Sequence, residues 1–182
     1  MIPVPIDEIV ELGLGLDLIA TQNLTKDSGV PGFISRDLTT ITVDLGVFEK
    51  RPFLCRKIIA HELAHSLLHR DFYSNISYSD VSGWLGVIRS ISNTDLERLE
   101  WQADALGSLI CVPKKELGRH VKTALQRATL NKEFNINKVN SKMLAKYIGS
   151  SLDKIFEVPA EVIVWRIEMD GLLPPDKLQE GA

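Results

Sequence analysis

The residues with the clearest chemical capacity are His61 and His65, with Glu62 directly after the first histidine. Two histidines four residues apart lie one above the other on the same face of a helix. In that geometry both imidazoles can bind a single Zn²⁺, and the intervening glutamate can take a proton from a water molecule at the metal. The HExxH spacing therefore predicts a metal site in which Glu62 is the general base.

The segment that carries this motif, residues 54–69, has the pattern of a helix buried on several sides. Most of its circumference is apolar, through Leu54, Ile58, Ile59, Ala60, Leu63, Ala64, Leu67 and Leu68. Pro52 fits the first helical turn, where a missing N–H costs nothing. The alternative is that the histidines are only hydrogen-bonded core residues. Unpaired polar groups in an apolar interior are costly, however, and this favours a bound ion.

A third ligand is expected because a catalytic zinc takes three protein ligands and keeps an open position for water. The capping box at residues 94–97 predicts a second helix, which runs to about Ile110 and is stopped by Pro113. Its apolar stripe consists of Leu96, Leu99, Ala103, Leu106 and Ile110. Glu100 falls inside this stripe and is the predicted ligand. Two alternatives stay open: Glu100 could reach solvent from a boundary position, and Glu97 could be the ligand, although the capping box already explains Glu97.

Supporting residues can be placed around the three ligands. Asp104, one turn after Glu100, could accept the second N–H of His61 or His65 and fix the tautomer of that ring. His69, one turn after His65, could contact a ligand in the same way or donate to the oxyanion. Three further candidate oxyanion donors are Tyr73, Tyr78 and His120. The last of these is more simply explained as a surface residue of a helix.

A different zinc-protease arrangement, with a third histidine ligand, is excluded. It requires Gly at position 68 and His at position 71, whereas this chain has Leu68 and Asp71. In the remaining His–His–Glu arrangement, zinc would lower the pKa of its water to about 7 and polarise the scissile carbonyl. Glu62 would pass the water proton to the leaving amine, a role worth roughly 10²–10⁴ in rate. The predicted chemistry is therefore peptide-bond hydrolysis.

The composition is that of an ordinary soluble globular protein, with 182 residues, 45% apolar and 25% charged, most simply forming one domain. A net charge of −3 does not indicate a polyanionic partner. Cys55 and Cys111 are too few for a disulfide scaffold. The N-terminus lacks a basic segment followed by an apolar run, and no apolar run approaches the length of a membrane span. The expected location is the cytoplasm.

The elements that must position the site begin with a helix over residues 6–12, an ambiguous segment over 14–20 that could hold a short strand, and a turn at 27–32. Residues 33–35 and 39–44 predict a hairpin with one solvated face. The edge of the 39–44 strand could pair with an extended substrate backbone. Residues 44–51 are expected to form only a connector into the HExxH helix.

After the HExxH helix, residues 70–93 are expected to form a long loop of the kind that often carries function. Residues 81–88 within it remain undecided between strand and helix. Beyond the Glu100 helix, the sequence predicts a helix over 114–128, a loop over 131–140, a helix over 141–148 capped by Ser141, and helices over 151–156 and 159–169. The predicted fold class is α+β and mostly helical.

Taken together, these motifs resemble those of the ImmA/IrrE family of metallopeptidases. HELAHSLLH at residues 61–69 is similar to the family's HELGHxLLH, and EWQAD at 100–104 is similar to its E-x-x-A-N/D segment. The helix end at residues 109–113 is similar to the family's L-L-M-P. Other similar segments are Ile2-Pro3-Val4, the hairpin, and Phe156-Glu157-Val158 with Arg166-Ile167. The departures are Lys57 where the family often has Phe, and Leu106-Gly107 in place of Phe-Ala.

The resemblance implies that His61, His65 and Glu100 bind zinc and that Glu62 is the general base. It also implies a zincin-like metallopeptidase fold with a small antiparallel sheet before the HExxH helix. We expect a single domain over residues 1–182, with a zincin-like core at 1–130 and a C-terminal helical subdomain at 131–182. Family members are cytoplasmic proteases that cut a partner repressor of helix-turn-helix type in mobile-element or stress regulation. A repressor of that type is therefore the expected protein substrate.

A rival hypothesis comes from residues 114–146, which carry nine Lys or Arg against Glu116 and Glu133, a local charge of +7. Such a segment could bind nucleic acid or an acidic partner. The protein would then be a non-proteolytic module that binds a regulator or DNA, with a structural or vestigial metal site. Ordinary solvated helix faces are the simpler explanation, and direct nucleic-acid binding is not expected. Glu62 also argues against the rival, because a structural metal site needs no base.

Overall fold

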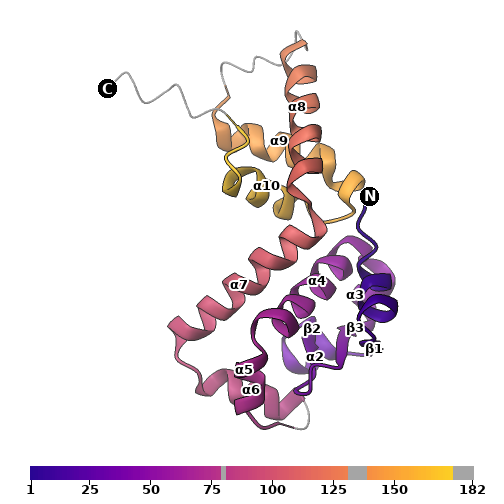
Figure 1. Ribbon diagram of the computed structural model, residues 1–182, viewed down its shortest axis with the longest axis vertical. Helices are drawn as coiled ribbons and strands as arrows, with labels where there is room; N and C mark the ends of the chain where they lie inside the picture. Colours follow the sequence, from indigo (N-terminus) through magenta and orange to yellow (C-terminus); the bar gives the residue numbers. More distant parts are fainter. Residues whose placement is uncertain (79–80, 131–138, 174–182) are drawn as a thin grey trace. The chain divides into compact units, whose positions relative to one another are not determined.

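The computed structural model describes residues 1–78, 81–130 and 139–173, which are mostly helical with a small sheet (Figure 1). The predicted α+β class is confirmed. The chain divides into two compact units, Pro5–Cys111 and a second that joins Met1–Val4 to Val112–Ala182. Helix α8 (Lys114–Leu130) belongs to the second unit. In the described part of the chain, no helix has the length and apolar character needed to cross a membrane.

The sheet of the first unit has the strand order β1 (Asp17–Thr21), β3 (Thr40–Asp44), β2 (Gly32–Ile34). β2 and β3 pair antiparallel, with Phe33 opposite Thr42, so the predicted hairpin is confirmed. β1 runs parallel to β3, however, and the prediction of a purely antiparallel sheet is wrong. β1 is largely exposed and lacks the alternation of a half-buried strand, so its sequence pattern did not define its partner.

The position of β3 also corrects the expected route for a substrate. β3 is the central strand and pairs with a neighbour on both sides, so it has no free edge to offer. β2 is an outer strand of this sheet. A substrate backbone that adds to the sheet would therefore pair with β2 or β1.

The segments around the strands are more helical than predicted. α1 (Ile6–Glu8) continues into a π-helical turn, η1 (Ile9–Gly13), and the pair ends at Gly13 as expected. α2 (Leu24–Ser28) occupies the start of the expected turn. α3 (Leu45–Lys50) replaces the expected connector. Asp44 caps α3, because its carboxylate accepts hydrogen bonds from the N–H groups of Gly46 and Val47.

The centre of the first unit is α4 (Pro52–Leu68), the predicted HExxH helix. Its buried face includes Ala60 and Ala64, both fully buried, and it packs on β2, β3 and α7 (Asn93–Cys111) (Figure 1). α7 can approach α4 closely because of Gly107. A Cβ on Gly107 would lie 3.0 Å from the backbone nitrogen of His61 and 3.1 Å from the carbonyl of Ala60. Only glycine fits this crossing without displacing one of the helices.

The stretch expected as a loop contains two helices, α5 (Arg70–Asn75) and α6 (Val81–Ser90). Tyr73 and Trp84 are buried and stack with their ring centroids 5.8 Å apart. This aromatic packing stabilises helices that the many serines and glycines of the segment obscure in the sequence. The predicted loop is therefore wrong at α5, and the segment left undecided at residues 81–88 is helical.

Helix α7 starts earlier than its predicted capping box. The Ser92 hydroxyl accepts a hydrogen bond from the Asp95 N–H at 3.2 Å and donates to the Asp95 carboxylate at 2.7 Å. The cap is therefore Ser92, two residues before Thr94, and Asp95 completes the box. Glu97, whose side chain the predicted box had explained, is exposed.

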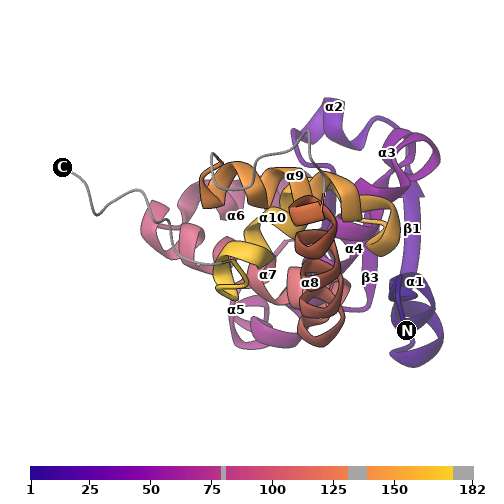
Figure 2. The ribbon, with the colours of Figure 1, turned by 90° about the horizontal axis from the view of Figure 1, so that it is seen from above.

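The second unit consists of α8, α9 (Ser141–Phe156) and α10 (Ala160–Met169), of which α9 and α10 pack against each other (Figure 2). α9 is one continuous helix, not the two that were predicted, and Asn140 rather than Ser141 caps it. Arg166 is 1% exposed and donates to the carbonyl of Val112 at 2.7 Å and to the carboxylate of Asp170 at 2.6 Å. The predicted loop at residues 131–140 lies mostly outside the described residues.

Candidate metal centre

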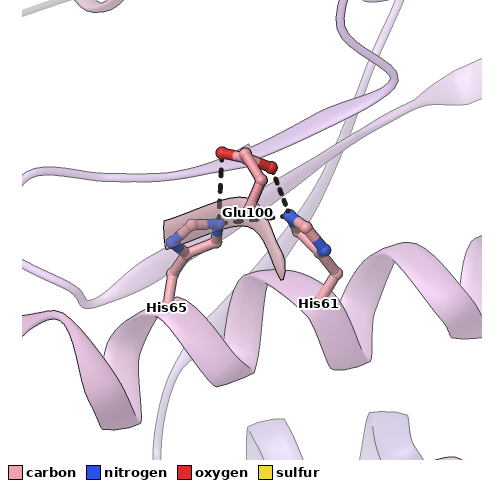
Figure 3. A group of neighbouring side chains, drawn as sticks. All are labelled: His61, His65 and Glu100. Carbon is pink, nitrogen blue, oxygen red and sulfur yellow. Dashed lines mark hydrogen bonds and ion pairs between the residues drawn. The ribbon is translucent and has the colours of Figure 1, made fainter. Parts of the chain in front are cut away.

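The two HExxH histidines and Glu100 meet at one point between α4 and α7 (Figure 3). Glu100 Oε2 lies 3.1 Å from His61 Nε2, and Glu100 Oε1 lies 3.6 Å from His65 Nε2. The two Nε2 atoms are 3.1 Å apart. One ligand atom from each residue lies within 4.8 Å of the other two, so this group could hold a metal ion.

The donor atoms are of the kinds that bind divalent metal ions. His61 Nδ1 lies 3.0 Å from the carboxylate of Asp104 and donates its hydrogen to it, so Nε2, which faces Glu100 Oε2, is the ring nitrogen that can bind a metal ion once it has lost its own hydrogen. His65 Nε2 lies on the same side, facing the other carboxylate oxygen. Two imidazole nitrogens and one carboxylate oxygen are the ligand set of the His₂Glu catalytic zinc sites.

Glu100 is less buried than the sequence suggested. Its side chain is 43% exposed, so it borders the apolar stripe of α7 and does not lie in the core. Its carboxylate nevertheless points toward the two histidines (Figure 3). Glu97 is exposed and is not among the residues that the structure brings together.

The two histidines differ sharply in charge preference. Burial disfavours the charged form of His61, but the carboxylates of Asp104 and Glu100 outweigh this and raise its pKa to about 10. Burial, reinforced by the charge on His61, lowers the pKa of His65 to about 3. His65 is therefore neutral at physiological pH, while His61 must release a proton before its Nε2 can bind a cation.

Glu62 lies beside the three candidate ligands and borders the same cleft. It is 7% exposed, and burial raises its pKa to about 7. β2 lies directly against it: a Cβ on Gly32 would lie 2.4 Å from Ile58 Cγ2, and the Ile34 N–H hydrogen-bonds to the Glu62 carboxylate. A carboxylate with a pKa close to neutrality can both accept and return a proton, as a general base must.

The predicted oxyanion donors have different surroundings. Tyr73 is buried beside His65, with ring centroids 6.2 Å apart, and burial raises its pKa. Tyr78 donates its hydroxyl hydrogen to the carbonyl of Ile34 at 3.0 Å, so it supports β2. His69 is buried behind His65 and is not part of the cleft lining. His120 belongs to the second unit, where its ring contacts Phe156. Tyr73, which is 1% exposed, is also absent from the cleft lining, so none of the four candidates borders the described cleft.

Sequence reasoning missed Gln102, whose Oε1 lies 3.0 Å from His69 Nε2. It also left His69 undecided, and the structure places His69 Nδ1 2.9 Å from His65 Nδ1. The position of His69, one turn after His65, did indicate a contact between these two histidines. No spacing within α7 marks Gln102, because its partner, His69, lies between α4 and α5.

The cleft in front of the histidines has a volume of about 410 Å³. Its floor is His61, Glu62 and His65, and its walls are largely apolar. The wall on the sheet side includes Val30, Pro31 and Phe33, and the wall on the α6 side includes Trp84, Leu85 and Ile88. The cleft thus combines polar groups at its base with apolar sides, as ligand sites usually do.

Comparisons with known proteins do not assign a family. No family model matches the sequence, and no curated protein matches it. The resemblance to ImmA/IrrE metallopeptidases therefore depends on the motifs of α4 and α7 themselves. Function has to be argued from the geometry of the cleft.

Proposed function

We propose that this protein is a zinc-dependent endopeptidase of the ImmA/IrrE type, with a zincin-like core. The observation that carries the proposal is the position of Glu62, a buried carboxylate with a pKa of about 7 beside three converging ligands. A purely structural metal site would be closed by a fourth protein ligand and would have no use for a base. Here the described ligands number three and face a cleft.

The roles of the residues follow from their surroundings. Zn²⁺ held by His61, His65 and Glu100 would supply Lewis-acid polarisation of the scissile carbonyl and of the attacking water. Glu62 accepts the proton of that water and returns it to the leaving amine, and removing such a group typically costs roughly 10²–10⁴ in rate.

The proposed substrate is a protein segment in extended conformation. β2 is an outer strand that borders the cleft at Gly32 and Phe33, so it can pair with a substrate backbone and hold it across Glu62. Main-chain pairing gives affinity with little sequence preference. Following the resemblance, we propose that the segment belongs to a partner repressor of helix-turn-helix type.

The rival function, binding of nucleic acid or of an acidic partner without cleavage, has less support. Some of the basic residues that motivate it are paired within their own unit: Arg119 with Glu116, and Lys114 with Asp170 at 3.6 Å. Paired charges of this kind attract a polyanion less strongly than free ones. Proteolysis therefore remains the first proposal.

The direct test uses the zinc-loaded protein and a candidate repressor of helix-turn-helix type, with and without a chelator. We expect mass spectrometry to detect one defined set of fragments, which does not form when the chelator is present. The rate of cleavage by Glu62→Gln should be at least about 100-fold lower than that of the wild type. Glu97→Gln, which changes an exposed carboxylate of α7, is the matched control and should cleave normally. A Glu62→Gln protein that cleaves at the wild-type rate would overturn the mechanism.

A further inference from the structure

Behind the cleft, Gln102, His69 and the metal-ligand candidate His65 form a hydrogen-bonded row. His65 Nδ1 lies 2.9 Å from His69 Nδ1, and His69 Nε2 lies 3.0 Å from Gln102 Oε1. His65 and His69 are 4% and 5% exposed, and Gln102 is half-buried on α7. The row links the end of α4 to α7 on the side of His65 that faces away from Glu100.

The positions of the protons along the row follow from the atom types. An amide oxygen can only accept, so His69 must carry its hydrogen on Nε2 and donate it to Gln102. A neutral imidazole has one N–H, so His69 Nδ1 then has a lone pair. The 2.9 Å contact between the two Nδ1 atoms needs one hydrogen, which must come from His65. His65 Nε2 is left with a lone pair, directed at Glu100.

We propose that Gln102, acting through His69, fixes the tautomer of His65 so that Nε2 is free to bind a metal ion. Gln102 and His69 are positioning residues, since neither lines the cleft. The reverse order of donors would place a hydrogen on His65 Nε2 and block it as a ligand. The two histidine ligands are thus oriented by different means. The carboxylate of Asp104 orients His61, and a neutral pair, His69 with Gln102, orients His65; we call this pair the relay.

The relay joins α4 to α7 by a second route beside the ligands themselves. Glu100 contacts the Nε2 side of His65, while Gln102, two residues further along α7, acts on its Nδ1 side through His69. α7 therefore both supplies the third ligand and sets the second ligand's tautomer. Groups that orient a ligand in this way typically change metal affinity by roughly 10–100-fold when removed.

The first test measures tautomers in the metal-free full-length protein with ¹⁵N-labelled histidine. Long-range ¹H–¹⁵N correlations report which ring nitrogen carries hydrogen. We expect His65 to be protonated at Nδ1 and His69 at Nε2. Gln102→Met should abolish this defined pattern, and Gln126→Met, the same change at an exposed helical position, should preserve it. A wild-type His65 that is protonated at Nε2 and bare at Nδ1 would overturn the inference.

The second test measures Zn²⁺ affinity by competition with a chromophoric chelator. Gln102→Met and His69→Leu should each weaken binding by roughly 10–100-fold. His69→Asn keeps an acceptor near the former Nδ1 position and should recover most of the loss, which a merely structural role for His69 would not predict. Equal affinity of His69→Leu and wild type would contradict the relay, and this comparison decides the case if Gln102→Met fails to fold.

The inference rests on the proposed function only for the reason why His65 Nε2 should be kept free, because the tautomers themselves do not depend on it. The tautomers are measured without zinc and without substrate. If the protein binds zinc with the expected tautomers but cleaves nothing, the endopeptidase proposal fails and the relay stands. If it cleaves its substrate while His65 carries hydrogen at Nε2 in the metal-free state, the relay fails alone.

Discussion

At the scale of single residues, the site places two chemically identical side chains in opposite states. His61 faces Asp104 at 3.0 Å and Glu100 at 3.1 Å, which hold its pKa at about 10. His65, one turn later, is buried next to His69 and the charged His61, and its pKa falls to about 3. Only the surroundings differ, so the charge on the metal-free site depends on the carboxylates of α7.

This arrangement predicts how the stability of the metal-free protein depends on pH. The raised pKa of His61 contributes stability that is fully present below its unfolded value of about 6.5 and is lost as pH rises through about 10. The raised pKa of Glu62 acts in the same direction, with its contribution lost as pH rises through about 7. The Tm measured with chelator present should therefore decrease as the pH rises from about 7 to about 9.

Asp104→Asn should make this decline shallower, because it removes the side-chain partner that holds the His61 proton on Nδ1. Glu97→Gln, an exposed change on the same helix, should leave the slope unaltered. Calorimetric scans across the pH range measure both. A metal-free protein whose Tm increases steadily up to about pH 9 would show that His61 is not stabilised as a cation.

At the scale of elements, the site depends on how closely α7 crosses α4. Gly107→Ala would place a Cβ 3.0 Å from the His61 backbone nitrogen, so one helix must move. We expect a loss of about 1–3 kcal/mol in the free energy of unfolding and weaker zinc binding, because Glu100 is carried by the displaced helix. Denaturant unfolding and zinc titration measure the two effects.

Gly86→Ala is the matched control for this change. A Cβ on Gly86, in the exposed part of α6, meets no atom within 4 Å, so the same substitution should be neutral or stabilising by up to about 1 kcal/mol. Equal stability and zinc affinity of Gly107→Ala and Gly86→Ala would mean that the helix crossing does not position the ligand.

The elements also show what the sequence could and could not predict. α4 and α7 are long, and their patterns of apolar residues predicted both helices. The positions of His61, His65 and Glu100 on these helices predicted that the three side chains would meet. The short helices α3 and α5 were missed and α6 was left undecided, because α3 depends on one capping residue, Asp44, and α5 and α6 depend on aromatic packing. Gln102 was missed because its partner comes from a different helix.

At the scale of the whole molecule, the candidate metal site and its supporting residues all lie in the unit Pro5–Cys111. The second unit has its own core, in which Arg166 is the largest fully buried side chain and is held by Val112 and Asp170. The sequence predicted a separate helical part at the C-terminus. The sequence could not assign α8 to this unit, because amphipathic spacing shows which face of a helix is buried but not which element packs against that face.

The second unit gives a separate prediction about stability. Arg166→Met would leave the Asp170 carboxylate without its 2.6 Å partner and the Val112 carbonyl without a donor. We expect a loss of about 3–5 kcal/mol in the free energy of unfolding, measured by denaturant titration followed by circular dichroism. Lys146→Met, at an exposed position of α9, should change it by less than about 0.5 kcal/mol. Similar unfolding midpoints for the two variants would contradict the role given to Arg166.

The central claim is that His61, His65 and Glu100 together bind one divalent metal ion. Zinc titration of the metal-free protein by calorimetry tests it most directly, with Glu100→Gln beside Glu97→Gln. We predict one zinc per chain for the wild type and for Glu97→Gln, and affinity reduced by at least about 100-fold in Glu100→Gln, because a charged ligand is lost. Wild-type affinity in Glu100→Gln, or no stoichiometric binding by the wild-type protein, would contradict the account.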